Sequence, residues 1–160
     1  MTAWSGEDGR SSEAPPLAEQ GIVLRNHPSE LARFDALLSQ FPSDKLLSEE
    51  QLFAIRLCAH EAITNIISYA FADHREHSID VRVTVFAKEI RLTIYDDGRP
   101  FDPIEAPAPD VGNGARDPQI GGYGIHLIRN FSKAMHYKRV ENKNRLTVVL
   151  PRDNNAPGPA

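Results

Sequence analysis

The fold of this chain is decided by residues 80–98, which read DVRVTVFAKEIRLTIYDDG. Apolar and polar residues alternate twice in this stretch, and the apolar positions are Val81, Val83, Val85, Ile90, Leu92 and Ile94. A period of two predicts two strands, each apolar on one face, joined in a hairpin at Ala87-Lys88-Glu89. A sheet with one apolar face requires helices on that side alone.

Two helical patterns precede this hairpin. Residues 27–41 (HPSELARFDALLSQF) place apolar residues at helical spacing after Pro28, and Pro42 ends the pattern. A second helix is predicted from about Glu49 to Ala70, because Ser48 and Gln51 have the spacing of a capping box. Its apolar stripe consists of Leu52, Ile55, Ala59, Ala62, Ile63 and Ile66.

The remaining patterns complete a sheet. Residues 21–26 (GIVLRN) indicate a first strand, 124–133 a helix, and 134–141 and 145–150 a closing antiparallel pair that turns at Asn142-Lys143-Asn144. Residues 103–121 are rich in proline and glycine and indicate a long loop, either a functional lid or a disordered segment. The predicted fold class is therefore α+β, a two-layer sandwich of a mostly antiparallel sheet with helices on one face.

The composition is that of one soluble globular domain. The chain has 160 residues, of which 41% are hydrophobic, and its 18 basic and 22 acidic residues give a net charge of −4. Without a basic excess, nucleic acid is not expected as a partner. No apolar run is long enough to span a membrane and the N-terminus lacks a signal-peptide pattern, so we expect a cytoplasmic protein with no membrane contact.

The two ends of the chain differ in composition from its centre. Residues 1–20 and 151–160 are rich in small and polar residues and in proline, so we expect a disordered lead-in and tail around a domain of residues 21–150. The single cysteine, Cys58, falls within the second helical pattern and is expected to be a buried, reduced thiol.

The first of three polar motifs lies on the second helix. Glu61 and Asn65 are four residues apart and so share a helix face, roughly opposite the apolar stripe. This pair could simply be solvated. An amide oxygen beside a carboxylate could also hold a hydrated Mg²⁺ and orient a proton acceptor, and the residues alone leave both readings open.

The second motif follows the strand that ends at Asp96. The Asp96 carboxylate could accept a hydrogen bond from an exocyclic amine, Gly98 would let a planar ring approach the backbone, and Phe101 could line the edge of that ring. The alternative is a polar turn with Phe101 packed in the core.

The third motif is a glycine-rich helix start. Gly121, Gly122 and Gly124 run directly into the predicted helix, where backbone N–H groups and the helix dipole suit phosphate oxygens. A flexible loop before a helix is the alternative. The stretch is neither a Walker A motif, because no Gly-Lys-Ser/Thr follows, nor a dinucleotide-binding fingerprint.

The order of these motifs, Glu-x-x-x-Asn, Asp-x-Gly and Gly-Gly-x-Gly, resembles that of the GHKL (Bergerat-fold) ATP-binding superfamily. The resemblance covers nearly all of residues 21–150. Within the superfamily, Gly-Arg-Pro-Phe-Asp-Pro at 98–103 is similar to the small bacterial anti-sigma-factor serine/threonine kinases. The superfamily at large favours a glycine where this chain has Pro100.

The resemblance implies a role for each motif and implies ATP and Mg²⁺ as cofactors. Glu61 matches the general base, and Asn65 matches the Mg²⁺ ligand. Asp96 matches the carboxylate that reads adenine, with Gly98 making room for the ring. The phosphate-cradling glycines match Gly122 and Gly124, and the ATP lid matches residues 103–120.

The resemblance also implies a function. It points to an ATP-dependent serine/threonine-protein kinase and anti-sigma factor that phosphorylates an anti-anti-sigma (STAS-type) protein and switches partners with a sigma factor or another regulator. It further implies a homodimer formed through the N-terminal strand and helix. Two alternatives remain, a non-catalytic ATP-binding module and a detached ATPase domain of a sensor kinase. Glu61 favours the kinase because binding alone needs no base. His60 is expected to be exposed or packed rather than phosphorylated.

Overall fold

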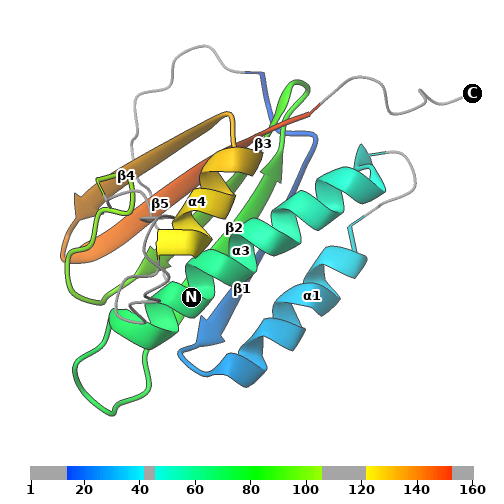
Figure 1. The fold of residues 1–160 in the computed structure, drawn as a ribbon. Coiled ribbons are helices and arrows are strands. Elements are labelled where there is room, and N and C mark those ends of the chain that lie inside the picture. The colour runs from blue at the N-terminus through cyan, green and yellow to red at the C-terminus, as the bar shows by residue number, and fades with distance from the viewer. Residues whose placement is uncertain (1–13, 42–45, 106–121, 153–160) are drawn as a thin grey trace, which may run out of the picture.

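The structure, a computed structural model, describes residues 14–41, 46–105 and 122–152. It contains a five-stranded antiparallel sheet with the strand order β1-β2-β3-β5-β4. The strands are β1 (Ala18–Arg25), β2 (Ser78–Val85), β3 (Glu89–Asp96), β4 (Ala134–Val140) and β5 (Lys143–Pro151). Figure 1 shows how β3 runs along the middle of the sheet, between β2 and β5.

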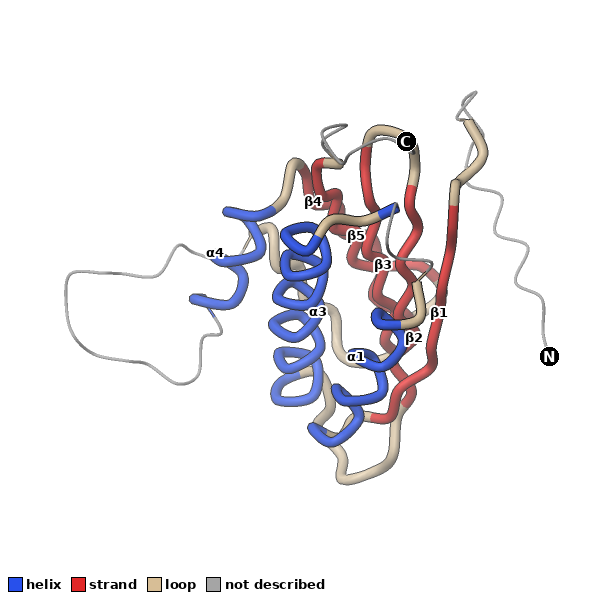
Figure 2. Tube along the Cα trace, turned by 90° about the vertical axis from the view of Figure 1, so that its right-hand side faces the viewer, coloured by secondary structure: helices blue, strands red, loops and turns tan. Residues whose placement is uncertain are grey.

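Helices cover one face of this sheet, as the alternation in residues 80–96 predicts. They are the short 3-10 helix η1 (Pro28–Glu30), α1 (Leu31–Ser39), α3 (Glu49–Tyr69) and α4 (Gly122–Phe131). In the side view of Figure 2, all helices of the described residues lie on the same side of the sheet. The predicted α+β two-layer sandwich is confirmed. None of the helices in the described part of the chain is both long and apolar enough to cross a lipid bilayer.

The core lies between the sheet and its helices. Its largest fully buried side chains include Leu24, Phe34, Leu38, Ile55, Ile63, Ile79, Ile90, Leu92, Ile94, Ile128 and Leu150. Burying each side chain of this kind contributes about 1.5–3 kcal/mol relative to leaving it exposed. Cys58 of α3 is also buried in this core, and burial raises the pKa of its thiol to about 12. The expectation of a buried thiol is therefore confirmed.

Local signals in the sequence fix the ends of two elements. The hairpin between β2 and β3 closes with the Phe86 N–H donating to the Glu89 carbonyl oxygen over 2.8 Å, close to the predicted turn. At the start of α3, the Gln51 N–H donates to Ser48 Oγ over 3.1 Å, and the Ser48 N–H donates to Gln51 Oε1 over 2.8 Å. The predicted capping box is thus present.

The sheet extends further at both ends than the sequence indicates. The strand predicted at 21–26 begins at Ala18, because the Leu17 N–H donates to the Val85 carbonyl oxygen over 2.7 Å and pairing with β2 continues from there. At the other end, β5 includes Pro151. The rest of the expected lead-in and tail, residues 1–13 and 153–160, lies outside the described residues.

The closing hairpin turns earlier than predicted. The sequence indicated a turn at Asn142–Asn144, but the turn consists of Glu141 and Asn142, with φ values of 50° and 63°. A two-residue turn with both φ values positive matches the right-handed twist of the strands that it joins. Asn144 is consequently a strand residue of β5, paired with Asp96 of β3. This correction changes the composition of the candidate site.

Candidate functional site

The first motif faces the start of α4. A Cβ atom placed on Gly124 would lie only 2.5 Å from Glu61 Oε2 and 3.5 Å from Asn65 Nδ2. Real Cβ atoms do not approach other atoms to 2.5 Å, so the backbone of α4 reaches the Glu61 carboxylate only because residue 124 is glycine. The structure therefore brings Glu61, Asn65 and Gly124 together from two helices that are distant in sequence.

The second motif lies at the end of β3. Asp96 is only 5% exposed, and its Oδ1 accepts hydrogen bonds from the Gly98 N–H (2.9 Å) and from Asn144 Nδ2 (3.0 Å). Burial raises the pKa of Asp96, while these two hydrogen bonds oppose the rise. The other carboxylate oxygen, Oδ2, has no hydrogen-bond partner among the described residues. Every fully buried side-chain oxygen or nitrogen in those residues has a partner, so Oδ2 is not fully buried. Oδ2 is therefore accessible as an acceptor.

The loop after Asp96 is docked on the end of α3. A Cβ on Gly98 would lie 2.5 Å from Ala70 Cβ, which makes glycine necessary for this close approach. The Arg99 N–H donates to the Ala70 carbonyl oxygen (2.9 Å), and Arg99 Nε donates to the Tyr69 carbonyl oxygen (2.7 Å). A cation at a helix C-terminus also interacts favourably with the helix dipole. One helix, α3, thus carries Glu61 and anchors the Asp96 loop.

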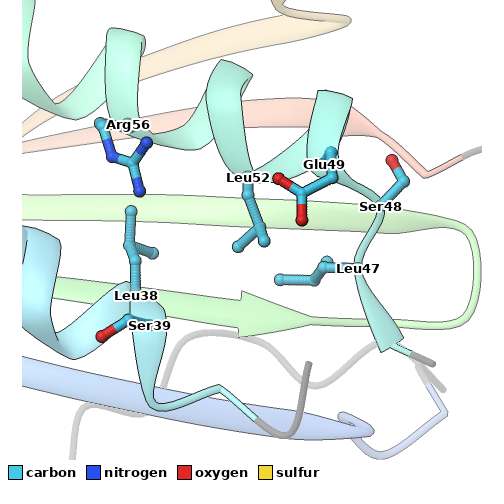
Figure 3. A pocket seen from close by; sticks show the side chains of 7 residues that line it. All are labelled: Leu38, Ser39, Leu47, Ser48, Glu49, Leu52 and Arg56. Atoms are coloured by element: carbon cyan, nitrogen blue, oxygen red, sulfur yellow. The ribbon is translucent and has the colours of Figure 1, made fainter. Parts of the chain in front are cut away.

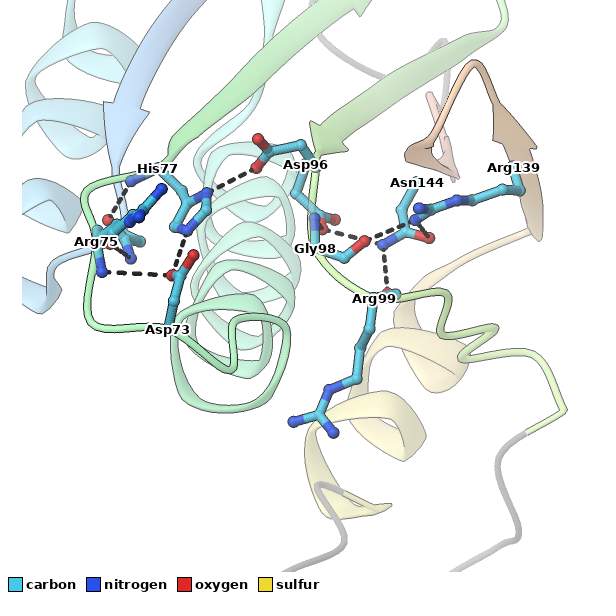
Figure 4. Close-up of polar contacts among 10 residues, drawn as sticks. Asp73, Arg75, His77, Asp96, Gly98, Arg99, Arg139 and Asn144 are labelled. Atoms are coloured by element: carbon cyan, nitrogen blue, oxygen red, sulfur yellow. Dashed lines mark hydrogen bonds and ion pairs between the residues drawn. The ribbon is translucent and has the colours of Figure 1, made fainter.

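A polar network from the closing hairpin holds this loop from the other side (Figure 4). Asn144 is 5% exposed, and its Nδ2 also donates to the Arg99 carbonyl oxygen over 2.9 Å. Its Oδ1 accepts from the Tyr137 hydroxyl (2.6 Å) and from Arg139 Nη1 (3.0 Å). Arg139 Nη1 also donates to the Gly98 carbonyl oxygen over 2.7 Å. These three side chains were not predicted from the sequence. A two-residue turn at Glu141-Asn142, in place of the predicted turn at 142–144, would have placed Asn144 beside Asp96.

A second polar cluster, shown in Figure 4, adjoins Asp96. His77 Nε2 lies 2.6 Å from Asp73 Oδ1, and His77 Nδ1 lies 3.2 Å from Asp97 Oδ1. The imidazole stacks on the Phe71 ring, with centroids 4.1 Å apart. The hydrogen bond to Asp73 raises the pKa of His77 and lowers the pKa of Asp73. His77 therefore ties the loop after α3 to the end of β3, a link that the sequence analysis also missed.

The other predicted site residues are placed only in part. Phe101 is 53% exposed, so the alternative that packs it in the core is wrong. Gly122 is the first residue of α4. Gly121 and residues 106–120 of the expected lid lie outside the described residues.

His60 of α3 points away from this site. Its Nε2 lies 2.8 Å from Asp35 Oδ1 on α1, and the same oxygen lies 3.3 Å from Arg56 Nε. The imidazole is part-buried between the two helices. This confirms the expectation of a packing histidine.

A separate pocket of about 410 Å³ opens between the end of α1 and the start of α3. Figure 3 shows its lining side chains, which are Leu38, Ser39, Leu47, Ser48, Glu49, Leu52 and Arg56. None of the predicted site residues lines it. The pocket lies at the N-terminal part of α3, whereas Glu61 and Asn65 belong to the C-terminal half.

Comparisons with known proteins identify the family of this domain. The family model described as "Histidine kinase-like ATPase domain" matches residues 24–150. The serine/threonine-protein kinase BtrW of Bordetella bronchiseptica is 36% identical over 97 residues, which are 61% of this chain and 68% of that protein. The serine-protein kinase RsbW of Listeria monocytogenes is 30% identical over 95 residues, which are 57% of this chain and 60% of RsbW.

Two further similarities are more distant. An anti-sigma F factor of Clostridium novyi is 20% identical over 101 residues, which are 63% of this chain and 70% of that protein. A solved blue-light activated histidine kinase of Erythrobacter litoralis shares the fold, with a TM-score of 0.51 and 18% identity over 78% of this chain and 41% of its own. The family model covers most of the chain, from β1 to β5, and this protein therefore belongs to the histidine kinase-like ATPase domain family of the GHKL superfamily.

Proposed function

We propose that this protein is an ATP-dependent serine/threonine-protein kinase that acts as an anti-sigma regulatory factor. The names of BtrW and RsbW as protein kinases, and of the more distant relative as an anti-sigma F factor, support this class. The observation that carries the proposal is that α3 anchors two of the motifs. Its Glu61 side chain contacts the start of α4, and the Asp96 loop docks on the C-terminal end of α3.

ATP would bind with its base at the end of β3. Asp96 Oδ2 would accept a hydrogen bond from the exocyclic amine of adenine, and the exposed Phe101 ring would line the base. The triphosphate would extend toward the start of α4, where the backbone at Gly121, Gly122 and Gly124 would offer N–H groups to its oxygens.

The donor set fits a magnesium ion that is held mainly by the nucleotide. No group of three or more His, Cys, Asp or Glu among the described residues is placed to hold a metal. The Asn65 amide oxygen would be the protein ligand, with phosphate oxygens and water completing the shell, which is the arrangement that Mg²⁺ prefers. When bound, the ion would neutralise charge on the phosphates.

Glu61 is the group that would take part in the chemical step. As a serine or threonine hydroxyl attacks the γ-phosphorus, its proton passes to the Glu61 carboxylate while the bond to the β-phosphate oxygen breaks and ADP leaves. The contact between Glu61 and Gly124 would keep this carboxylate next to the phosphate-binding backbone.

The substrate and the assembly are part of the same proposal. The acceptor would be an anti-anti-sigma (STAS-type) protein, whose phosphorylation would exchange it for a sigma factor or another regulator. The domain would span the sheet from Ala18 to Pro151, slightly more than the predicted 21–150, and would form a homodimer through the N-terminal strand and helix. The edge strand β1 supports this, since Val23 on its open face is 55% exposed.

The test is label transfer from radioactive ATP. The purified chain, Mg²⁺, γ-labelled ATP and a candidate STAS-type protein are expected to give label on a serine or threonine of the partner. That label should survive acid and should disappear when Mg²⁺ is chelated. Acid-labile label on a histidine would favour a sensor-kinase ATPase, and ATP binding without transfer to any candidate partner would favour a binding module.

A further inference from the structure

Two side chains of β4 bond to the amide of Asn144, and one of them, Arg139, fixes its orientation. Arg139 Nη1 lies 3.0 Å from Asn144 Oδ1, and the Tyr137 hydroxyl lies 2.6 Å from the same atom. A guanidinium group has donors only, so the Asn144 atom that faces Arg139 must be the amide oxygen. The amide nitrogen must then face Asp96 Oδ1 at 3.0 Å and the Arg99 carbonyl oxygen at 2.9 Å.

This orientation controls the chemistry of the Asp96 carboxylate. The Asn144 amide and the Gly98 N–H both donate to Oδ1, and donors at a carboxylate favour its ionised form. Two charged groups lie near Asp96. Arg139 also favours its ionised form, whereas the neighbouring Asp97, which contacts His77, disfavours it. Burial of Asp96 also opposes ionisation. An ionised carboxylate can only accept hydrogen bonds, whereas a protonated one can also donate.

We propose that Tyr137 and Arg139, acting through Asn144, keep Asp96 an acceptor and thereby set the preference of the site for adenine over guanine. The inference rests on the proposed function, in which Asp96 reads the base. Adenine presents an amine donor where guanine presents a carbonyl oxygen, so an acceptor at Oδ2 attracts adenine and repels guanine. Tyr137 and Arg139 are positioning residues, because they act on Asp96 through Asn144.

Removal of Arg139 would allow the amide to rotate. Tyr137 can accept as well as donate, so it would tolerate the rotated amide. The amide oxygen would then face two acceptors, Asp96 Oδ1 and the Arg99 carbonyl oxygen. Two acceptors repel each other unless Asp96 takes up a proton. A protonated Asp96 could donate to the guanine carbonyl oxygen, so the two bases would be discriminated less well.

The experiment measures the affinity of the full chain for Mg-ATP and Mg-GTP by calorimetry between about pH 5 and about pH 8.5. Arg139→Met and Tyr137→Phe are expected to lower ATP affinity about three- to tenfold near neutral pH, which corresponds to the net free energy of one hydrogen bond. The ATP-to-GTP affinity ratio should fall, and the pH profile of ATP binding should move to higher pH. Arg139→Lys keeps the charge and a donor and should recover most of the loss.

Matched controls come from the open face of the sheet. Arg82→Met removes the same charge from β2, and Tyr95→Phe removes a hydroxyl from β3. Neither of these side chains is hydrogen-bonded to the Asp96 or Asn144 side chain. Both should behave as wild type. Tyr137→Phe deletes a single oxygen atom and leaves Arg139 in place, so its effect on the ratio and the pH profile should be smaller than that of Arg139→Met. Asn144→Asp, which places an acceptor directly against Asp96 Oδ1, keeps the test available if Arg139→Met does not fold.

The outcomes separate the inference from the proposed function. The inference alone would be overturned if Tyr137→Phe and Arg139→Met both kept the wild-type ATP-to-GTP affinity ratio and pH profile while Asp96→Ala lost ATP affinity. Lower affinity without a change in ratio or profile would also overturn it, because that result reports only a structural role. A wild-type chain that binds no Mg-ATP would overturn the proposed function and the inference with it.

Discussion

The Glu61 carboxylate lies directly beneath the backbone of another helix. Its Oε2 occupies the space that a side chain at position 124 would need. Placing the proposed base against a backbone surface restricts the conformations that its side chain can adopt. The residue that permits this is Gly124, which contributes by having no side chain.

Replacing Glu61 with alanine should separate binding from chemistry. We expect Mg-ATP affinity close to wild type and phosphorylation of the partner reduced by ~10²-fold or more, since general-base catalysis is worth about that much. Calorimetry and label transfer measure the two quantities. Glu50→Ala, an exposed change in the first turn of α3, is the control. An equal loss of binding and transfer would refute the role of Glu61.

Replacing Gly124 with alanine tests the close approach itself. The added methyl group must displace either α4 or the Glu61 side chain, and overpacking of this kind typically costs about 1–3 kcal/mol. We therefore expect a lower free energy of unfolding in urea and slower label transfer. Gly21→Ala is the matched control, because its Cβ would approach no atom closer than 3.4 Å. Wild-type stability and transfer in Gly124→Ala would contradict the geometry.

At the scale of elements, α3 sets the spacing of the site. It begins at the Ser48 capping box, contacts α4 through Glu61, and ends where Arg99 and Ala70 hold the β3 loop. The base-reading end and the phosphate end of the proposed site are thus fixed to one rigid element. The His77 cluster adds a second attachment, between the loop after α3 and Asp97.

The second attachment should depend on pH. The hydrogen bond with Asp73 raises the pKa of His77 above its ordinary value of 6.5, so protonated His77 is favoured in the folded state. Its contribution to stability is full below pH 6.5 and is lost as pH rises through the raised folded-state value. The lowered pKa of Asp73 adds stability that is present above its ordinary value of 3.8 and is lost as pH falls through its folded-state value.

Urea denaturation across this range is the measurement. His77→Gln should be less stable than wild type at mildly acidic pH, and the difference should shrink in alkaline buffer. His136→Gln, an exposed change on β4, should show no such trend. A difference between wild type and His77→Gln that is constant with pH would contradict the ion pair.

At the scale of the whole molecule, much of the fold follows from short-range patterns. The period of two in β2 and β3, the stripe of α3 and its capping box all depend on residues within a few positions of one another. The spacing of the motifs also made Glu61, Asn65 and Asp96 candidate site residues, and the structure places Glu61 and Asn65 beside Gly124. Ala18 was missed as a strand residue because nothing local marks it, and its place in β1 depends on pairing with Val85.

The polar network around Asp96 was missed for a similar reason. The predicted three-residue turn would pair residue 141 with residue 145, whereas the observed two-residue turn pairs Val140 with Lys143 and so changes the register of β4 and β5. Asn144 was assigned to the turn, and so neither it nor its partners Tyr137 and Arg139 could be placed beside Asp96. Contacts between strands that are distant in sequence require the register, which the alternation of residues does not specify.

The proposed homodimer is tested at this scale. Val23→Lys places a positive charge on the open face of β1, opposite Asp80 of β2. In the monomer this charge would pair favourably with Asp80, but burying it in a dimer interface would cost free energy. Sedimentation should show a shift from dimer to monomer, with Mg-ATP affinity unchanged. His136→Lys, on the opposite edge strand, is the control. An unchanged mass for Val23→Lys would exclude this face.

The state of Cys58 has a practical consequence for following nucleotide binding in solution. It is the only cysteine in the sequence, and its buried thiol, with a pKa of about 12, is almost entirely unreactive toward maleimides at neutral pH. A cysteine engineered at an exposed position such as Phe101 would therefore take up a fluorophore or spin label selectively, without background from the native chain. Such a label would report directly on events beside the proposed base pocket.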